Sequence, residues 1–312
     1  MLILDNCSRI LFVADPQILG DTFGIRIFSK IVNYDSDKHI HRTYKRAVAH
    51  VRPNVIVFLG DLMDEGSVAD DEKFLKYLKR FREILPKPTD CQMIYIPGDN
   101  DIGGEREMVK PLKVSRFQQY FNTNGTSSWK INNNDNIYHI NRITSEIPNE
   151  ERTSEKSFNF FISHYSILSH LGSFCERAIE RFKPQVIFVG DIHKSNLIRS
   201  SLRNLQQTNK TSLHNSKTFD LNAMKNNQKV IEIQVPSCSY RMGFPSQIGY
   251  GQAIIEDGLL HYSVLPISNR FIQLIMYLMF VCCFVICIIC TKCKLRKNRG
   301  NMKGYRRIQN KV

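Results

Sequence analysis

Five short apolar runs in the sequence are each followed at once by carboxylate, carboxamide or imidazole side chains. The runs are 10–14, 55–59, 93–96, 158–162 and 186–189, and the polar side chains that follow them are Asp15, Gln17, Asp61, Asp99, Asn100, Asp101, His164, Asp191 and His193. Open α/β sheets place ligand sites at the carboxyl ends of their strands, so we expect these side chains to converge. Converging carboxylates repel one another unless a cation neutralises them, which predicts a metal site.

Each of these residues also has a simpler interpretation when taken alone. An Asp after a strand is commonly a helix cap or a turn residue. His164 alone would more often be a structural histidine. The repetition of the pattern after five successive strands favours the metal site, and mixed Asp, Asn and His ligands suit Mn, Fe or Zn better than Ca.

The same apolar runs alternate with helical patterns, which predicts an α/β layer fold. Further strands are expected at 230–235, 252–255 and 260–265, and helices at 40–51, 69–84, 114–121 and 173–182. Two segments rich in Asn, Ser, Lys and Thr, 132–136 and 200–227, are expected to be surface loops or insertions. The sequence shows no internal repeat, and one catalytic-type domain is expected to fill residues 1–268.

The order of these motifs resembles that of the calcineurin-like metallophosphoesterases. The motifs are Asp15-Pro16-Gln17, Gly60-Asp61-Leu62-Met63-Asp64, Gly98-Asp99-Asn100-Asp101, Ser163-His164 and Gly190-Asp191-Ile192-His193. Longer strings, among them Phe58–Gly66 and Pro236-Ser237, are similar to the membrane-bound metallophosphoesterase 1 group. The resemblance implies a β-sandwich flanked by helices, and a dinuclear-metal hydrolase that removes ethanolamine phosphate from glycosylphosphatidylinositol (GPI) anchor glycans.

The resemblance also assigns roles to the metal ligands. Asp15, Gln17 and His193 would bind the first metal ion, and Asp61 would bridge both ions. The second ion would be held by Asp99, His164 and Asp191. Gln17, Asp99 and Asp191 stand where the family usually has His, Asn and His, and the two added carboxylates favour harder cations. Two divalent ions are therefore expected, Mn first, with Zn, Fe or Mg as alternatives.

The catalytic assignments are Asn100 and Asp101. Asn100 occupies the position of a family His that contacts phosphate, and Asn100 is expected to orient the phosphoryl group. Asp101 is expected to hold the Asn100 side chain in place. An Asn has no proton to give at neutral pH, so the leaving group would be protonated by His170, by solvent or by the substrate's own amine. The nucleophile would be a water shared by the two metal ions, with its pKa lowered by both.

Two other functions remain open at this point. The first is a phosphoesterase acting on a nucleotide, a phosphoprotein or another phospholipid. The second is a membrane-tethered binding protein that keeps the fold without turnover, suggested by the substitutions at Gln17, Asn100 and Asp191. Asp64 and Arg241 are expected either to contact the substrate or to have plain structural roles.

The C-terminal part of the sequence predicts a membrane anchor. Residues 271–290 carry no charge, and 20 residues of helix span about 30 Å, the thickness of a bilayer's hydrocarbon core. The basic residues of 291–312 are expected to stay in the cytosol, which places the domain in the lumen of the endoplasmic reticulum or Golgi. No signal peptide is visible at the N-terminus, so either an N-terminal span is missing from this sequence or the domain faces the cytosol.

The net charge of +14 is concentrated in this tail, which holds nine Lys or Arg and no acidic residue. The rest of the chain has 34 basic and 29 acidic residues, a balance that argues against a nucleic-acid partner. A hydrophobic content of 42% excludes a mostly disordered chain. The expected partners are the lipid bilayer and a glycolipid or GPI-anchored protein as substrate.

Overall fold

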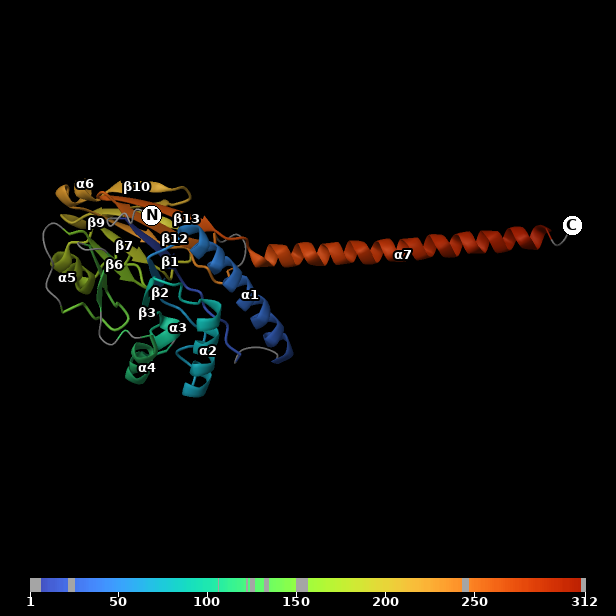
Figure 1. Ribbon diagram of the computed structural model, residues 1–312, viewed down its shortest axis with the longest axis horizontal. Coiled ribbons are helices and arrows are strands. Elements are labelled where there is room, and N and C mark those ends of the chain that lie inside the picture. Colours follow the sequence, from blue (N-terminus) through green and yellow to red (C-terminus); the bar gives the residue numbers. More distant parts are fainter. Residues whose placement is uncertain are drawn as a thin grey trace. The chain divides into compact units, whose positions relative to one another are not determined.

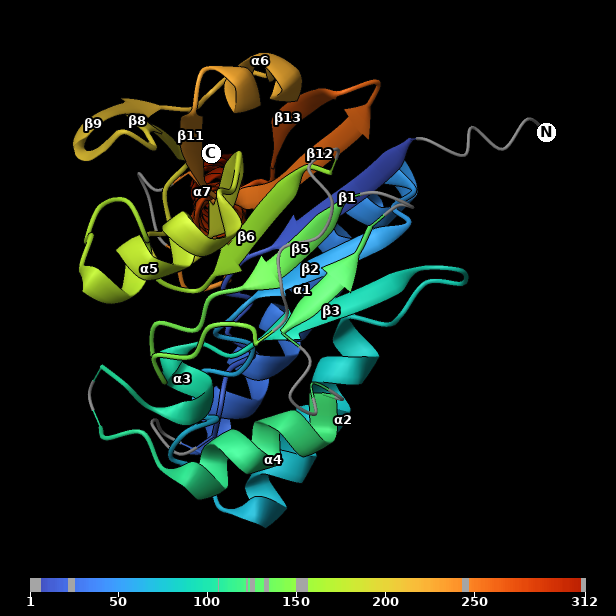
Figure 2. The same ribbon diagram turned by 90° about the vertical axis from the view of Figure 1, so that its left-hand side faces the viewer.

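The computed structural model describes residues 7–21, 26–105, 107–121, 123, 127–131, 135–149, 157–242 and 247–309. The chain forms two compact units, residues 1–268 and 269–312, each described here by itself. The first unit contains two mixed β-sheets with helices on their outer faces (Figures 1 and 2). This arrangement confirms the predicted β-sandwich flanked by helices.

The first sheet has six strands in the order β10-β13-β12-β1-β2-β3. β1, β2 and β3 are parallel, whereas β12, β13 and β10 continue the sheet in antiparallel pairs. Since the three parallel strands end at one edge, the residues that follow them are delivered to the same place. The bounds are β1 Ser8–Val13, β2 Val55–Leu59, β3 Gln92–Ile96, β10 Lys217–Asp220, β12 Gly249–Glu256 and β13 Leu259–Pro266.

The second sheet has seven strands in the order β4-β5-β6-β7-β11-β8-β9. Its central strands β5, β6, β7 and β11 are parallel, and β4, β8 and β9 pair antiparallel at the two sides. The bounds are β4 Ser128–Lys130, β5 Asn136–His139, β6 Asn159–Ser163, β7 Val186–Val189, β8 Asn196–Ser201, β9 Asn204–Ser212 and β11 Lys229–Gln234.

Alternating side chains of the strands fill two different layers of the core. In β1, Ile10 and Phe12 face the second sheet, and Phe12 stacks on Phe188 of β7 with ring centroids 4.1 Å apart. Leu11 and Val13 point the other way, into a cluster shared with the helices. The two-residue period of a strand thus explains why these strands read as continuous apolar runs: both of their faces are buried.

The helices cover the outer faces of the two sheets. α1 (Arg26–Val51), α2 (Asp71–Ile84) and α4 (Pro111–Phe121) pack on the first sheet, and α5 (Ser173–Phe182) packs on the second. α2 shows the local logic: the Asp70 side chain caps its first turn by accepting from the Lys73 amide, and its apolar residues lie on one buried face. α3 (Asp99–Ile102) and α6 (Leu221–Asn226) are short.

Most predicted elements have the expected positions, two predictions need correction, and a third falls mostly outside the described residues. The helix predicted at 40–51 begins at Arg26. The predicted loop 200–227 was wrong, because it contains most of a β-hairpin, β10 and α6; its strand β9 is polar and largely exposed, so no apolar pattern marks it. The predicted loop 132–136 lies mostly outside the described residues, and Asn136 begins β5.

The second unit is the helix α7 (Arg270–Gln309). Its segment Arg270–Arg296 has a mean hydropathy of 2.9 and is not buried. Among the described residues, α7 is the one helix long and apolar enough to span a membrane.

Candidate metal centre

The carboxyl ends of strands from both sheets meet at one place. β1, β2 and β3 end just before Asp15, Asp61 and Asp99, and β6 and β7 end just before His164 and Asp191. Because the two sheets pack face to face, the acidic residues of the first sheet lie against the histidine and aspartate of the second. The structure therefore brings together residues up to 176 positions apart in the sequence.

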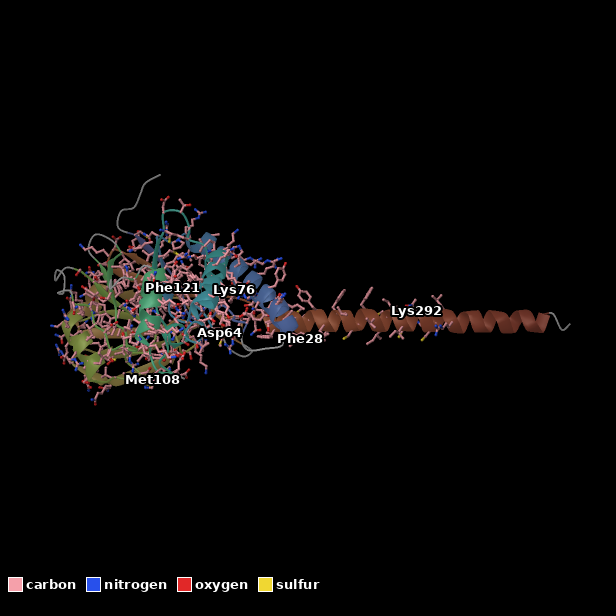
Figure 3. The ribbon with its side chains drawn as sticks, turned by 90° about the horizontal axis from the view of Figure 1, so that it is seen from below. Phe28, Asp64, Lys76, Met108, Phe121 and Lys292 are labelled. Carbon is pink, nitrogen blue, oxygen red and sulfur yellow. The ribbon has the colours of Figure 1, made fainter. Side chains whose placement is uncertain are left out.

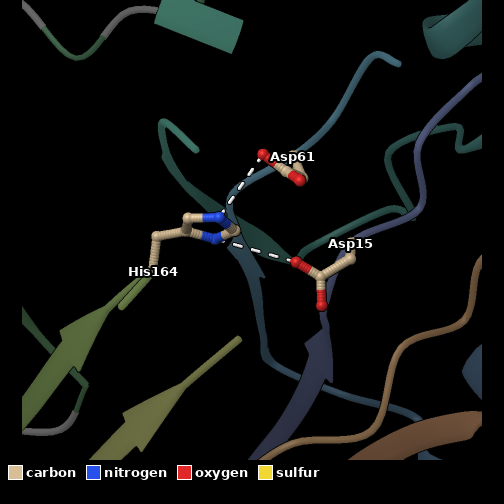
Figure 4. Close-up of side chains that lie close together, drawn as sticks. All are labelled: Asp15, Asp61 and His164. Atoms are coloured by element: carbon tan, nitrogen blue, oxygen red, sulfur yellow. Dashed lines mark ion pairs between the residues drawn. The ribbon is translucent and has the colours of Figure 1, made fainter. Parts of the chain in front are cut away.

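One group that could hold a metal ion consists of Asp15, Asp61 and His164, all buried (Figure 4). One ligand atom from each lies within 4.8 Å of the others. His164 Nε2 is 3.4 Å from Asp61 Oδ1, and His164 Nδ1 is 3.7 Å from Asp15 Oδ1. Two buried carboxylates this close to one imidazole need positive charge between them.

A second group consists of Asp99, His164 and Asp191. His164 Nε2 lies 3.1 Å from Asp99 Oδ1, while His164 Nδ1 lies 2.8 Å from the carbonyl oxygen of Leu59. A carbonyl only accepts hydrogen bonds, so Nδ1 carries the proton and donates. Nε2 then faces the carboxylates of Asp61 and Asp99, and it is the ring nitrogen that could bind a metal ion, as in metal-binding histidines whose other nitrogen donates to a carbonyl.

The residues expected to hold the first metal ion also offer buried atoms that suit a cation. Asp15 Oδ2, Gln17 Oε1 and His193 Nδ1 are buried atoms with no hydrogen-bond partner among the described residues. His193 Nδ1 lies 3.4 Å from Asp15 Oδ2, so two of these atoms face each other. Buried polar atoms are nearly always hydrogen-bonded, and three metal-binding atoms left unpaired together fit a divalent ion well.

Asp61, the predicted bridging ligand, accepts hydrogen bonds with both of its carboxylate oxygens. Its Oδ1 accepts from the Asn100 amide at 3.0 Å, and its Oδ2 accepts from Asn100 Nδ2 at 2.6 Å and from Gln17 Nε2 at 3.2 Å. Asn100 therefore holds Asp61 with both its backbone and its side chain. One hydrogen on Asn100 Nδ2 remains for a substrate oxygen.

Asp101 has a different place from the one expected. Its buried carboxylate accepts from the backbone amides of Leu62, Met63 and Gly98, at 2.9 to 3.1 Å. Among the described contacts, none joins it to the Asn100 side chain that it was predicted to hold. Asp101 instead ties the loop after β2 to the loop after β3, and so fixes Asp61 and Asp99 relative to each other.

Burial and like charges perturb the acids and bases of the site. Burial raises the pKa of Asp61 to about 6, with Asp15 and Asp99 adding to the effect and His164 opposing it. Burial likewise raises the pKa of Asp101 to about 7. For His164, burial lowers the pKa, but the surrounding carboxylates, Asp61 first, outweigh it and raise the pKa well above its usual value. These shifts show how strongly this cluster of acids favours bound positive charge.

Several of these residues are held in strained backbone conformations. Asp15, Gln17, Asp61, Asp191 and His193 all have φ between 43° and 60°, a region that non-glycine residues seldom adopt. Such strain costs about 1 to 3 kcal/mol per residue and gathers at functional sites. The concentration of left-handed residues at five predicted ligands supports a site built for ligand geometry rather than for stability.

Close approach also explains why one glycine is required here. A Cβ atom on Gly98 would lie 2.1 Å from Asp61 Oδ1 and 2.3 Å from the Asp61 amide nitrogen. Any side chain at this position would push the loop after β3 away from the loop after β2. Gly98 therefore allows the two acidic loops to meet.

Two residues missed by sequence reasoning support the site. Glu232 of β11 is fully buried and accepts from Ser166 Oγ, from the amides of Ile167 and Leu168, and from Gln234 Nε2. It thereby fixes the loop that follows His164. The signal was a single acidic residue inside an apolar strand, Val230–Val235.

The second missed residue is Tyr165, whose hydroxyl is hydrogen-bonded to the Asp99 carboxylate. Burial, followed by the Asp99 charge, raises the pKa of Tyr165 and keeps its phenol protonated. Of the residues expected to assist more loosely, Asp64 and Arg241 form an ion pair with each other, and His170 is exposed in the loop before α5.

The sequence matches a family model over residues 8–195, which is more than half of the chain and includes every predicted ligand. The model is that of the calcineurin-like phosphoesterases. This chain belongs to the calcineurin-like phosphoesterase family. The predicted resemblance is therefore confirmed, and the family consists of hydrolases that act on phosphate esters.

Curated relatives of this phosphoesterase include two eukaryotic proteins. A Metallophosphoesterase 1 homolog of Drosophila melanogaster is 30% identical over 128 residues, 41% of this chain and 33% of that protein. Cell division control protein 1 of Saccharomyces cerevisiae is 34% identical over 124 residues, 38% of this chain and 25% of that protein. The matched segments thus span a third or less of these relatives' length.

A solved structure of low sequence identity also aligns with this chain. A metallophosphoesterase from Sphaerobacter thermophilus aligns with 14% identity and a TM-score of 0.42, covering 86% of this chain and 91% of that one. The family and the two ligand groups that share His164 together indicate a dinuclear site for divalent metal ions. The identity of the metal stays a prediction.

Proposed function

We propose that this phosphoesterase is a membrane-anchored, metal-dependent phosphodiesterase whose substrate is an ethanolamine phosphate diester on a GPI-anchor glycan. The observation that carries the proposal is the set of unpaired, buried atoms Asp15 Oδ2, Gln17 Oε1 and His193 Nδ1 beside the group formed by Asp99, His164 and Asp191. Two adjacent ligand groups, which share His164 in the structure and would share Asp61 as a metal ligand, suit phosphoester hydrolysis better than a single structural ion.

Asp15, Gln17 and His193 would hold one ion, Asp99, His164 and Asp191 the other, and Asp61 both. Two divalent ions bound there would supply Lewis-acid stabilisation of the phosphoryl charge and would lower the pKa of a nucleophilic water. The protein's own part is positional. Asn100, anchored on Asp61 at 2.6 Å, presents its remaining N–H to a phosphoryl oxygen, and Asp101 keeps the two acidic loops in register.

A cavity of about 580 Å³ lies next to the second ligand set and supports an aminoalkyl phosphate as substrate. Tyr165 and Arg142 line it together with Glu105 and Glu107. The guanidinium of Arg142 suits a phosphate oxygen, and the two carboxylates with the Tyr165 ring suit a primary ammonium group. The Tyr165 phenol donates its one proton to Asp99, so the leaving oxygen would take its proton from solvent or from the substrate's own amine.

The proposed location follows from α7. The helix is long and apolar enough to span a bilayer, and the basic residues after it would stay cytosolic. The phosphoesterase domain would then face the lumen of the endoplasmic reticulum or Golgi, where GPI glycans are displayed. The curated relatives named Metallophosphoesterase 1 support the phosphoesterase activity, and the matches cover a third or less of their length.

The test uses the full chain in detergent micelles with added Mn²⁺. Metal content is measured beside hydrolysis of two matched phosphodiesters, one with an ethanolamine group and one with a propyl group in its place. We expect two bound ions, turnover that Asp61→Asn abolishes, and a preference for the amine that Glu107→Gln removes.

Each alternative gives a distinct result. Two bound ions without turnover on any phosphodiester would favour a binding protein that keeps the fold. Turnover without preference for the amine would favour a phosphoesterase with another substrate. Folded protein that binds no metal would contradict the proposed site itself.

A further inference from the structure

The first turns of α1 carry apolar side chains that nothing in the described structure covers. Phe28, Ile31 and Val32 are 64%, 63% and 41% exposed, and their spacing of three and four residues places them on one side of the helix. We call these three residues the α1 patch. Burial in α1 begins at Ser36, so the patch extends beyond the packed part of the helix, as the position of Phe28 in Figure 3 shows.

The charges around the α1 patch are positive on the outside. Lys30 and Lys38 are exposed, and Lys38 Nζ lies 4.4 Å from the centre of the exposed Tyr34 ring. The nearby acids are turned toward the domain: Asp37 pairs with Arg80 at 2.8 Å, and Asp35 accepts from the Tyr240 hydroxyl at 2.8 Å. An exposed apolar and aromatic cluster flanked by lysines is typical of a surface that rests on anionic lipid headgroups.

The metal centre lies at the same end of the domain. α1 begins there, because the chain passes from Asp15 at the end of β1 to the helix within eleven residues. A second link runs through Tyr240, which bonds Asp35 of α1, and through Ser237 in the same loop, which donates to the backbone oxygen of Asp15.

The chain also leaves the domain at this end. Phe12 pairs with Gly251, and Gly249 pairs with Pro266, so β13 finishes at the edge where β1 delivers Asp15. The Ile267 amide is still bonded to the Ile248 carbonyl, which leaves two residues, Ser268 and Asn269, before α7. Two residues reach at most about 7 Å.

From these observations we propose that the α1 patch inserts into the interface of the bilayer that α7 crosses, and so holds the metal centre toward the lipid headgroups. The inference rests on the membrane anchoring included in the proposed function. The chain leaves the domain at its Asp15 end two residues before α7, and Phe28, Ile31 and Val32 are among the exposed apolar side chains of this end. Substrates are then phosphodiesters in the headgroup layer rather than in bulk solution.

The test places a tryptophan at defined positions and asks which ones lipid reaches. The full chain is reconstituted in phosphatidylcholine–phosphatidylserine vesicles, with Trp129→Phe removing the native tryptophan, and lipids brominated in the acyl chain quench nearby indole fluorescence. The variants are Ile31→Trp in the patch, Lys87→Trp as the control, and Leu278→Trp within α7. Lys87 is exposed before β3, at the end of the sheet opposite the metal centre.

We expect brominated lipid to lower the fluorescence of Ile31→Trp about twofold, with Leu278→Trp quenched and Lys87→Trp unaffected. Quenching at Leu278 without quenching at Ile31 would overturn the docking of the patch, and a blue-shifted Ile31→Trp emission in that case would mean that protein covers it. Equal quenching at Ile31 and Lys87 would overturn the orientation. Absence of quenching at Leu278 would show that the anchoring itself fails.

Discussion

Replacing the buried Glu232 is expected to destabilise the protein and weaken metal binding, although this residue touches no predicted metal ligand. Its carboxylate accepts four hydrogen bonds, from Ser166 Oγ at 2.5 Å, Ile167 N at 2.8 Å, Leu168 N at 2.7 Å and Gln234 Nε2 at 3.1 Å. Three of the four donors belong to the loop directly after His164. The carboxylate therefore determines where that loop lies, and with it the direction of the His164 ring.

The magnitude follows from the hydrogen bonds. Glu232→Gln keeps one oxygen, enough for the two backbone amides, but turns an NH₂ group toward Ser166 and Gln234 and removes the charge. Hydrogen bonds to a charged group contribute about 1.5 to 3 kcal/mol and neutral ones about 0.5 to 1.5, so we expect a loss of about 2 to 4 kcal/mol. Glu232→Ala leaves both amides unpaired and should cost more. Residues that orient metal ligands typically change metal affinity by about 10- to 100-fold, and we expect the same here.

The assay combines urea denaturation with Mn²⁺ titration of the full chain in detergent. The matched control is Glu256→Gln, because Glu256 ends β12 at the opposite end of the sheet from the metal centre. We expect Glu256→Gln to behave like the parent protein in both measurements. A Glu232→Gln protein with parental stability and parental Mn²⁺ affinity would refute the reasoning.

Three further predictions concern pH and packing. The pKa values of Asp61 (about 6) and Asp101 (about 7) are raised above 3.8, so the folded metal-free protein holds protons that the unfolded chain has released. Its free energy of unfolding should therefore decrease as the pH rises from about 4 to 7. Denaturation of the chelated protein at several pH values measures this, and a free energy of unfolding that increases over this range would contradict it. Gly98→Ala should lower Mn²⁺ affinity at least ~10-fold by titration, while Gly172→Ala, with nothing within 4 Å of the new Cβ, should not. Burial lowers the pKa of His139 to about 3, so below pH 6.5 the unfolded chain binds a proton at this residue that the folded protein does not, and the folded protein loses stability. This loss amounts to about 2 kcal/mol in the free energy of unfolding at pH 5, and His139→Gln should abolish it. Denaturation curves of the two proteins measure the difference, and equal curves would contradict the prediction.

The strands that carry the metal centre were the most predictable part of the fold. β2 (Val55–Leu59) and β7 (Val186–Val189) lie where the sequence predicts them, because central strands buried on both faces appear as unbroken apolar runs. The residues just after them could be predicted as a group for the same reason. Because parallel strands end at one edge of a sheet, the residues that follow them in the sequence can be predicted to lie close together in the fold.

The elements that sequence reasoning missed have little apolar burial. β9 (Asn204–Ser212) forms an edge of the second sheet with mostly exposed side chains, so its composition is that of a loop. Its strand form comes from hydrogen bonds to β8, which are formed by the backbone and leave no mark in the sequence. The first turns of α1 were missed for a related reason, since their apolar residues face outward and follow no core pattern.

The roles of Asp101 and Glu232 depend on contacts between distant segments. Asp101 binds amides 38 and 39 residues away, and Glu232 binds amides 64 and 65 residues away. In both cases a buried carboxylate accepts the hydrogen bonds of loop amides that have no sheet partner and would otherwise bond to water. Which amides it reaches is decided by tertiary packing, so the sequence could show only that an acid stood in an apolar context.

The two halves of the metal centre differ in charge, and this difference bears on its chemistry. With Asp61 shared as proposed, the first ligand set would contribute one carboxylate (Asp15), whereas the second would contribute two, Asp99 and Asp191, beside His164. A set rich in carboxylates favours hard cations, while the set with Gln17 and His193 is closer to neutral. The more anionic half also adjoins the cavity lined by Tyr165. Asp99, Asp191 and His164 would therefore hold a hard ion, and such an ion would supply positive charge that offsets the negative charge created by cleavage of a phosphodiester.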